Sequence, residues 1–126
     1  MTRPDGPVED PSSTVLRAWE DLAAAIFDLR RATAGRGRPS RDVGVVLRQM
    51  VQGGVVNDLF VESVLGLQSL RNSVAHAEEV PNVGSAYIYA ERSRELRRAA
   101  NAISKMQEAS EGSVKEALDN DRNGLT

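Results

Sequence analysis

The chain has 126 residues, a formal net charge of −2, 40% hydrophobic residues and 27% charged residues, a composition typical of one soluble globular domain. It contains no cysteine, which excludes disulfides and cysteine metal sites, and its slight acidity argues against a general affinity for nucleic acid. No apolar run reaches the length of a membrane span, and residues 1–11 lack the apolar stretch of a signal peptide. We therefore expect a cytoplasmic protein without a membrane segment.

Residues 1–11 are rich in proline, glycine and acids and are expected to form a disordered N-terminal tail. Ser12, Ser13 and Thr14 offer N-caps for a first helix that runs to about Thr33. Apolar residues recur in this segment in steps of three and four, as they do on the buried face of a helix. The stripe consists of Val15, Trp19, Leu22, Ile26 and Leu29.

A basic linker, residues 34–39, separates this helix from a second one, which is expected to begin near Ser40 and to end at Gly53-Gly54. Asn57 is a suitable N-cap for a third helix. The apolar face of the second helix consists of Val43, Val46, Leu47, Met50 and Val51, and that of the third of Phe60, Val64, Leu67, Leu70 and Val74.

A loop around Pro81 precedes a fourth, long helix, which Ser85 is expected to cap and which runs through Met106. Residues 111–126 are polar, predict at most one marginal helical turn, and are expected to be a C-terminal tail. No segment shows the period-two alternation of a strand. The sequence therefore predicts an all-α protein, a small antiparallel four-helix bundle over residues 12–110 with disordered tails.

The third helix carries the only histidine of the chain, His76, shortly after Arg71 and Asn72. Histidine exchanges protons near neutral pH, and arginine is a planar cation suited to phosphate. At about 100° per residue, Asn72 and His76 lie about 40° apart, whereas Arg71 lies about 140° from His76 and off the apolar face. The three side chains meet only if the helix frays or kinks before His76, or if a second copy supplies one of them at a homodimer axis.

A purely structural interpretation of the same residues is also open. Arg71 would pair with an acid such as Glu78, while Asn72 and His76 would satisfy backbone groups and the dipole near the end of the helix.

Three sequence elements accompany this segment. They are Ser13-x-x-Leu16-x-Ala18-Trp19-x-x-Leu22, Leu67-x-x-Leu70-Arg71-Asn72-x-x-Ala75-His76, and Ala86-x-x-Tyr89 with Leu96. Together they resemble the HEPN superfamily over roughly residues 12–107, and most closely the bacterial HEPN-like proteins with an Arg-Asn…Ala-His third helix. Many relatives carry a glutamate in the first helix, where this chain has Ala23.

The resemblance implies a HEPN-like helical bundle, frequently dimeric, in which two Arg-x4-His motifs face a shared cleft. Active members are metal-independent endoribonucleases, and their catalytic arginine, polar residue and histidine correspond to Arg71, Asn72 and His76. The substrate would be RNA, cut by its own 2′-hydroxyl, with no cofactor required. The resemblance also suggests a role in phage defence or in a toxin–antitoxin system, with an antitoxin or another protein as partner.

Among the arginines between residues 30 and 41, we take Arg30, Arg31, Arg36 and Arg38 as candidates for guiding RNA to the cleft. No metal site is expected, because carboxylates and histidine do not cluster at ligand spacing. Many HEPN proteins are catalytically silent, so the alternative function is a non-catalytic homodimer that binds RNA, a nucleotide or a partner protein. A structural adaptor is a third alternative.

Overall fold

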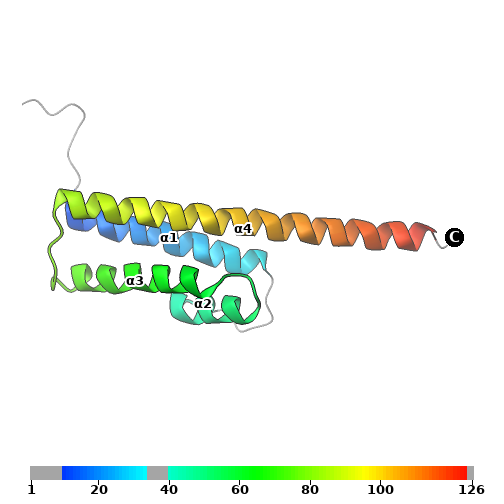
Figure 1. The fold of residues 1–126 in the computed structure, drawn as a ribbon, viewed down its shortest axis with the longest axis horizontal. Helices are drawn as coiled ribbons and strands as arrows, with labels where there is room; N and C mark the ends of the chain where they lie inside the picture. The colour runs from blue at the N-terminus through cyan, green and yellow to red at the C-terminus, as the bar shows by residue number, and fades with distance from the viewer. Residues whose placement is uncertain (1–9, 34–39, 125–126) are drawn as a thin grey trace, which may run out of the picture.

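The structure, a computed structural model, describes residues 10–33 and 40–124, and the side chains up to residue 109. These residues form four helices, and the described ranges contain no strand (Figure 1). The helices are α1 (Pro11–Ala32), α2 (Val43–Gln52), α3 (Asp58–Ala75) and α4 (Val83–Gly124). The predicted all-α fold, a small four-helix bundle, is therefore confirmed.

The three long helices do not all alternate in direction. α1 and α4 run in the same direction, and α3 runs back between their ends (Figure 1). The hydroxyl of Ser93 donates a hydrogen bond of 2.8 Å to the carbonyl of Ala18, and Arg97 pairs with Asp21 at 3.3 Å. α2 is short and packs beside α1 and α3. Because α2 only turns the chain at one end of the bundle, α1 and α4 become parallel neighbours instead of the antiparallel ones that four alternating helices would give.

The helix starts follow the capping rules, although often at a different residue from the expected one. Asn57 caps α3 as predicted, with its side chain accepting from the amide of Phe60 at 2.9 Å. α1 is instead capped by Asp10, and α2 by Asp42, whose carboxylate accepts from Gly44 N at 2.8 Å. The carboxylate that caps α1 lies upstream of the expected hydroxyls, and the one that caps α2 lies two residues after Ser40; an ionised acceptor suits the positive end of the helix dipole.

The start of α4 shows a reciprocal arrangement. Asn82 accepts from the amide of Ser85 at 2.8 Å, and the hydroxyl of Ser85 accepts from the amide of Asn82 at 3.0 Å. Ser85, the expected cap, thus closes a capping box three residues inside the start that Asn82 defines.

The core contains the apolar stripes that the sequence indicated. Leu22, Ile26, Val46, Leu47 and Val64 are completely shielded from solvent. Trp19 on α1 and Tyr89 on α4 add large buried rings. Together with the apolar stripes they form one core that all four helices share. Burial of this kind is the main stabilising contribution to a bundle of this size.

α4 continues well beyond the expected helix and beyond the rest of the bundle. It reaches Gly124, whereas Ala100 is the last buried residue among its side chains up to residue 109, the ones that the structure describes. The expectation of at most one helical turn after residue 110 is therefore wrong. Residues 101–111 contain neither proline nor glycine and include good helix formers, so nothing local ends the helix where the core ends.

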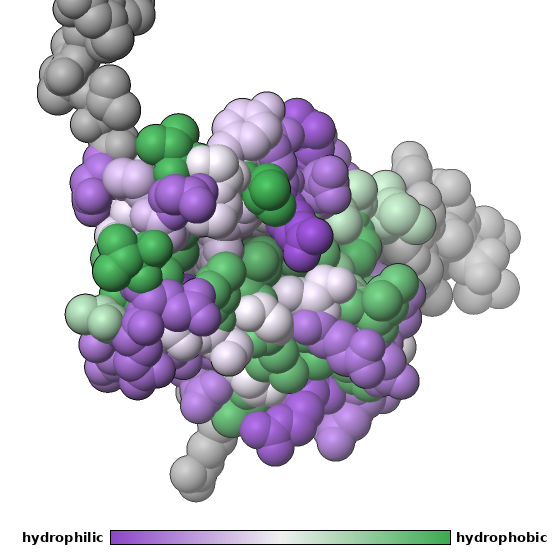
Figure 2. All heavy atoms as spheres, turned by 60° about the vertical axis from the view of Figure 1, so that its left-hand side comes forward, coloured by the Kyte–Doolittle hydropathy of each residue, from purple (hydrophilic) through white to green (hydrophobic). Residues whose placement is uncertain are grey.

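The outer surface combines polar side chains with separate apolar patches (Figure 2). Val80 and Val83, at the end where α3 joins α4, are 86% and 70% exposed. Among the helices that the structure describes, none combines the length and the apolar character that crossing a membrane requires.

Candidate functional site

α3 stays regular up to the histidine. His76 is the C-cap, and its amide donates to the carbonyl of Asn72 at 3.0 Å. Ala77 then adopts a left-handed conformation with φ 58°, and the amide of Glu78 donates to the carbonyl of Ser73 at 2.8 Å. These bonds form a Schellman-type ending. The helix therefore neither frays nor kinks before His76. This removes the way of bringing His76 to Arg71 within a single chain and leaves only the second copy.

Arg71 lies on the inner face of α3, and the expectation that it steps off the apolar face is wrong. It follows Val64 by seven residues and Leu67 by four, which are the spacings of one helix face. The side chain is half-buried, and its Nε is inaccessible to solvent. Arginine can occupy this position because its long aliphatic stem packs in the core while the head reaches outward.

The guanidinium of Arg71 is only partly satisfied within the described residues. Its Nη1 donates to Oδ1 of Asn72 at 3.1 Å, while the buried Nε has no hydrogen-bond partner there. Glu78, the acid considered for an ion pair, forms none with Arg71 in the described part of the chain. The Arg71–Asn72 contact thus joins two of the three predicted site residues, and a buried donor without a partner is costly enough to need an explanation.

Tyr89 on α4 contacts α3 one helical turn before Arg71. Its ring is 2% exposed, and its hydroxyl donates to the carbonyl of Leu67 at 2.9 Å. Burial raises the pKa of Tyr89 well above its usual range, and the positive charge of Arg71 acts in the opposite direction. Only the resemblance singles out Tyr89 in the sequence, although a tyrosine on an inner helix face needs a hydrogen-bond partner.

Asn72 and His76 lie on the outer face of α3, and both are exposed. Within the described residues the imidazole of His76 makes no hydrogen bond or ion pair. One chain therefore presents a half-buried cation held by Asn72, and an exposed imidazole one turn further on. Arg71 and His76 are not brought together within the chain.

The arginines chosen as RNA guides lie away from this corner. Arg30 donates through Nε to Oε1 of Gln49 on α2 at 3.1 Å, and Arg31 pairs with Asp28. Ala18 is the residue of α1 that contacts Ser93, one turn after Tyr89 on α4. Arg30 lies roughly 18 Å further along α1 from Ala18, at 1.5 Å per residue, and Arg31 lies next to it. Arg36 and Arg38 lie outside the described residues.

The described residues contain no group of three or more His, Asp or Glu side chains that could hold a metal ion. Comparison with protein-family models, with curated proteins and with solved structures finds no match for this chain.

Proposed function

We propose that the protein is a HEPN-like, metal-independent endoribonuclease whose active site is composite, with Arg71 and Asn72 from one copy and His76 from a second. The observation that carries the proposal is the half-buried guanidinium of Arg71, held by Asn72 and with a donor that no described residue satisfies. A cation fixed in this way is suited to an oxyanion such as a phosphate, which accepts several hydrogen bonds from one guanidinium.

The chemistry follows from these three groups. The neutral imidazole of His76 removes the proton from an RNA 2′-hydroxyl, whose oxygen attacks the neighbouring phosphorus. The bond from phosphorus to the 5′-oxygen breaks, a 2′,3′-cyclic phosphate forms, and the imidazolium of His76 gives the proton to the leaving oxygen. Arg71 stabilises the charge that develops on the phosphoryl oxygens, and Asn72 holds Arg71 in position. DNA lacks the nucleophile and would be resistant.

The regular end of α3 is the reason for a second copy. Since α3 is helical up to Ala75, the imidazole of His76 stays about 140° around the helix from Arg71. A two-fold axis beside α3 would supply the imidazole from the other chain. Leu65, which is 39% exposed, precedes Asn72 by one heptad and offers an apolar contact on the same outer face.

The test is cleavage of single-stranded RNA in the presence of EDTA by the wild-type protein and by Arg71→Met, Asn72→Ala and His76→Ala. We expect products that end in a 2′,3′-cyclic phosphate, and losses of at least about 100-fold for Arg71→Met and His76→Ala. Glu79→Ala, an exposed change just beyond the helix end, is the matched control and should retain the activity. Activity that persists in Arg71→Met and His76→Ala would contradict the catalytic assignment.

The second candidate is a non-catalytic HEPN-like dimer that binds RNA, a nucleotide or a partner protein such as an antitoxin. It is favoured by the Arg71–Asn72 hydrogen bond itself, because a guanidinium already held by a neighbour can bind an anion without any proton transfer. RNA binding that Arg71→Met abolishes, without cleavage in the wild type, would establish this function. A role in phage defence or in a toxin–antitoxin pair would suit either candidate.

A further inference from the structure

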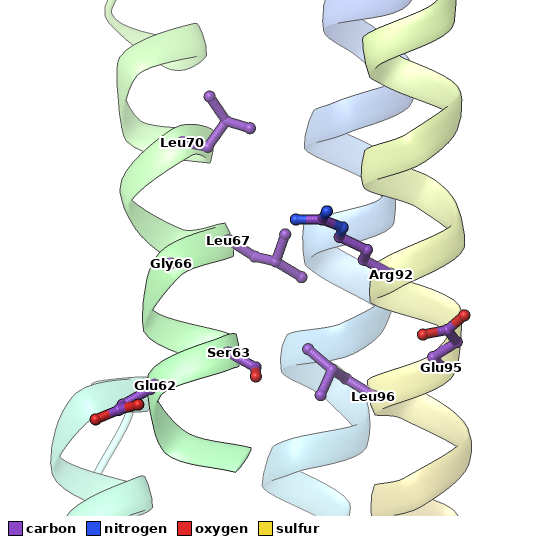
Figure 3. A pocket seen from close by; sticks show the side chains of 8 residues that line it. All are labelled: Glu62, Ser63, Gly66, Leu67, Leu70, Arg92, Glu95 and Leu96. Carbon is purple, nitrogen blue, oxygen red and sulfur yellow. The ribbon is translucent and has the colours of Figure 1, made fainter. Parts of the chain in front are cut away.

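α3 and α4 are separated by a groove of about 540 Å³ (Figure 3). At about 100° per residue, its lining residues Gly66 and Leu70 lie about 120° and 160° around α3 from Asn72, so the groove is on the far side of the helix. Leu67 and Leu96 extend into the gap from opposite helices, and Arg92 reaches across it from α4. Glu62 and Glu95 stand at the outer edges with their carboxylates turned away (Figure 3). An apolar floor with charged edges is the arrangement that accepts an amphipathic helix.

Gly66 is the second notable feature of the groove. It lies in the middle of α3, where a glycine destabilises a helix relative to alanine. A Cβ added at this position would meet no atom within 4 Å, so the described chain does not require a glycine there. A missing side chain on a groove wall allows the backbone of another helix to approach closely.

The groove side of α4 carries an exposed strip of three apolar residues along the bundle, interrupted by Arg92 and Glu95. Ile88, Ala99 and Met106 are separated by whole numbers of turns to within about 20°, so they lie in one line along the helix. Ile88 and Met106 are 54% and 69% exposed. Leu59, on the groove side at the start of α3, is 70% exposed. Exposed apolar side chains that recur on one face of a helix mark an interaction surface more often than scattered ones do.

α4 itself lacks a partner beyond the bundle. The contacts from Ser93 to Ala18 and from Arg97 to Asp21 set the register of α1 on α4, which places Ala32, the end of α1, beside about residue 107. Residues 108–124 therefore project by about 25 Å as a single helix (Figure 1). Isolated helices of this length are marginal in water and gain most of their stability from packing.

We propose that the groove is covered by α4 from a second copy of the chain. The groove and the exposed strip lie on one side of the same helix, so two α4 helices crossing antiparallel near Ile103 would cover both features in both copies at once. Such a contact is self-complementary, as a two-fold interface requires. Gly66 lets the incoming helix approach, and Met106 enters the open end of the groove beside Leu59.

This contact lies on the opposite side of α3 from Asn72, so it is compatible with the composite site and does not depend on it. Both contacts together would assemble four chains, whereas the groove contact alone would assemble two. In either case a variant that disrupts the groove contact should halve the molecular mass.

The test is sedimentation equilibrium of the full chain and of Met106→Glu, with Tyr87→Glu as the matched control, since Tyr87 is 65% exposed and lies off the strip. We expect Met106→Glu to halve the mass and Tyr87→Glu to leave it unchanged. Gly66→Ala should weaken the association at least about tenfold while raising the melting temperature of the dissociated chain. Opposite effects on association and on folding are specific to a glycine kept for a partner.

The position of the contact can be tested independently, because the chain contains no cysteine. Ala102→Cys, close to the expected axis, should cross-link to its counterpart in the second copy on mild oxidation, and Tyr87→Cys should not. A monomeric wild type would overturn the proposal, as would an oligomer whose mass is unaffected by both Met106→Glu and Gly66→Ala. RNA cleavage that survives Met106→Glu but not His76→Ala would separate this contact from the proposed active site.

Discussion

The phenol of Tyr89 donates a 2.9 Å hydrogen bond to the carbonyl of Leu67, one helical turn before Arg71. Through this bond α4 fixes the segment of α3 from which the guanidinium projects, and the nearby charge of Arg71 acts on the phenol in return. The position of Arg71 therefore depends on a residue distant in sequence. The candidate site is a product of the packing of α3 on α4 as well as of the motif on α3.

The buried phenol should make stability depend on alkaline pH. Because burial raises the pKa of Tyr89 in the folded state, its contribution to stability is fully present below about pH 10, the usual value for tyrosine, and is lost as the pH rises above it. We expect the free energy of unfolding to fall by about 1.4 kcal/mol for each pH unit above about 10 from this group alone.

Tyr89→Phe should remove that loss, at a cost of about 1 kcal/mol near neutral pH from the missing hydrogen bond. Urea unfolding between pH 8 and 11 measures both effects. Tyr87→Phe, which changes an exposed ring, is the control and should follow the wild-type curve. An alkaline loss of equal size in wild type and Tyr89→Phe would contradict the assignment.

Arg71 should show a difference between its two simplest replacements. Arg71→Met keeps most of the buried stem and removes the unsatisfied Nε, so we expect a change in stability of less than about 1 kcal/mol. Arg71→Ala also loses the packing and should destabilise the protein by about 1–2 kcal/mol. Both should lose RNA cleavage or RNA binding. If Arg71→Met unfolds the protein, the guanidinium has a structural role that the contacts do not show.

The end of α3 provides a prediction about the backbone. Ala77 has φ 58°, a conformation that glycine adopts without the steric cost that a Cβ imposes. Ala77→Gly should therefore stabilise the protein by about 1 kcal/mol, which corresponds to roughly 4–8 °C in melting temperature for a domain of this size. Ala75→Gly, at the last helical residue and two residues earlier, should destabilise it. A lower melting temperature for Ala77→Gly would show that the helix ends differently.

The projecting part of α4 should be dispensable for folding. A chain that ends at Ala109 retains every side chain that the structure describes, and the last buried one among these is Ala100. Its unfolding free energy should stay within about 0.5 kcal/mol of the full chain at dilutions where neither associates. Loss of a cooperative transition in differential scanning calorimetry would show that the segment supports the bundle.

Much of this fold could be predicted because helical periodicity is local. Steps of three and four residues predict the buried faces of α1, α2 and α3, and Asn57 is recognisable as the N-cap of α3, whereas Asp10 and Asp42 cap α1 and α2. The direction of α1 relative to α4 could not be predicted, since it depends on where the short α2 returns the chain. The length of α4 exceeds the predicted one, because the polar composition of residues 111–126 predicts a tail although a polar segment can also form an exposed helix.

The candidate site was predictable in its residues but not in its arrangement. The spacing of Asn72 and His76 placed both on one face, and the structure exposes both. The sequence-based prediction puts Arg71 off the face of Leu67, Leu70 and Val74, although its spacing from Val64 and Leu67 puts it on the inner face. Only the packing against α4 reveals that Tyr89 and the carbonyl of Leu67 form the support beneath it.

In the proposed active site, Arg71 comes from one chain and His76 from another. Mixing two inactive variants tests this arrangement most directly. Arg71→Met and His76→Ala chains, unfolded together and refolded in equal amounts, should recover cleavage of RNA in EDTA. Random pairing makes about half of the dimers mixed, and each mixed dimer carries one intact site, so we expect about a quarter of the wild-type activity. The same mixture without refolding should gain activity only as fast as chains exchange. Full wild-type activity of either variant alone, or no recovery in the refolded mixture when each variant is folded and associates normally, would contradict a site shared between two chains.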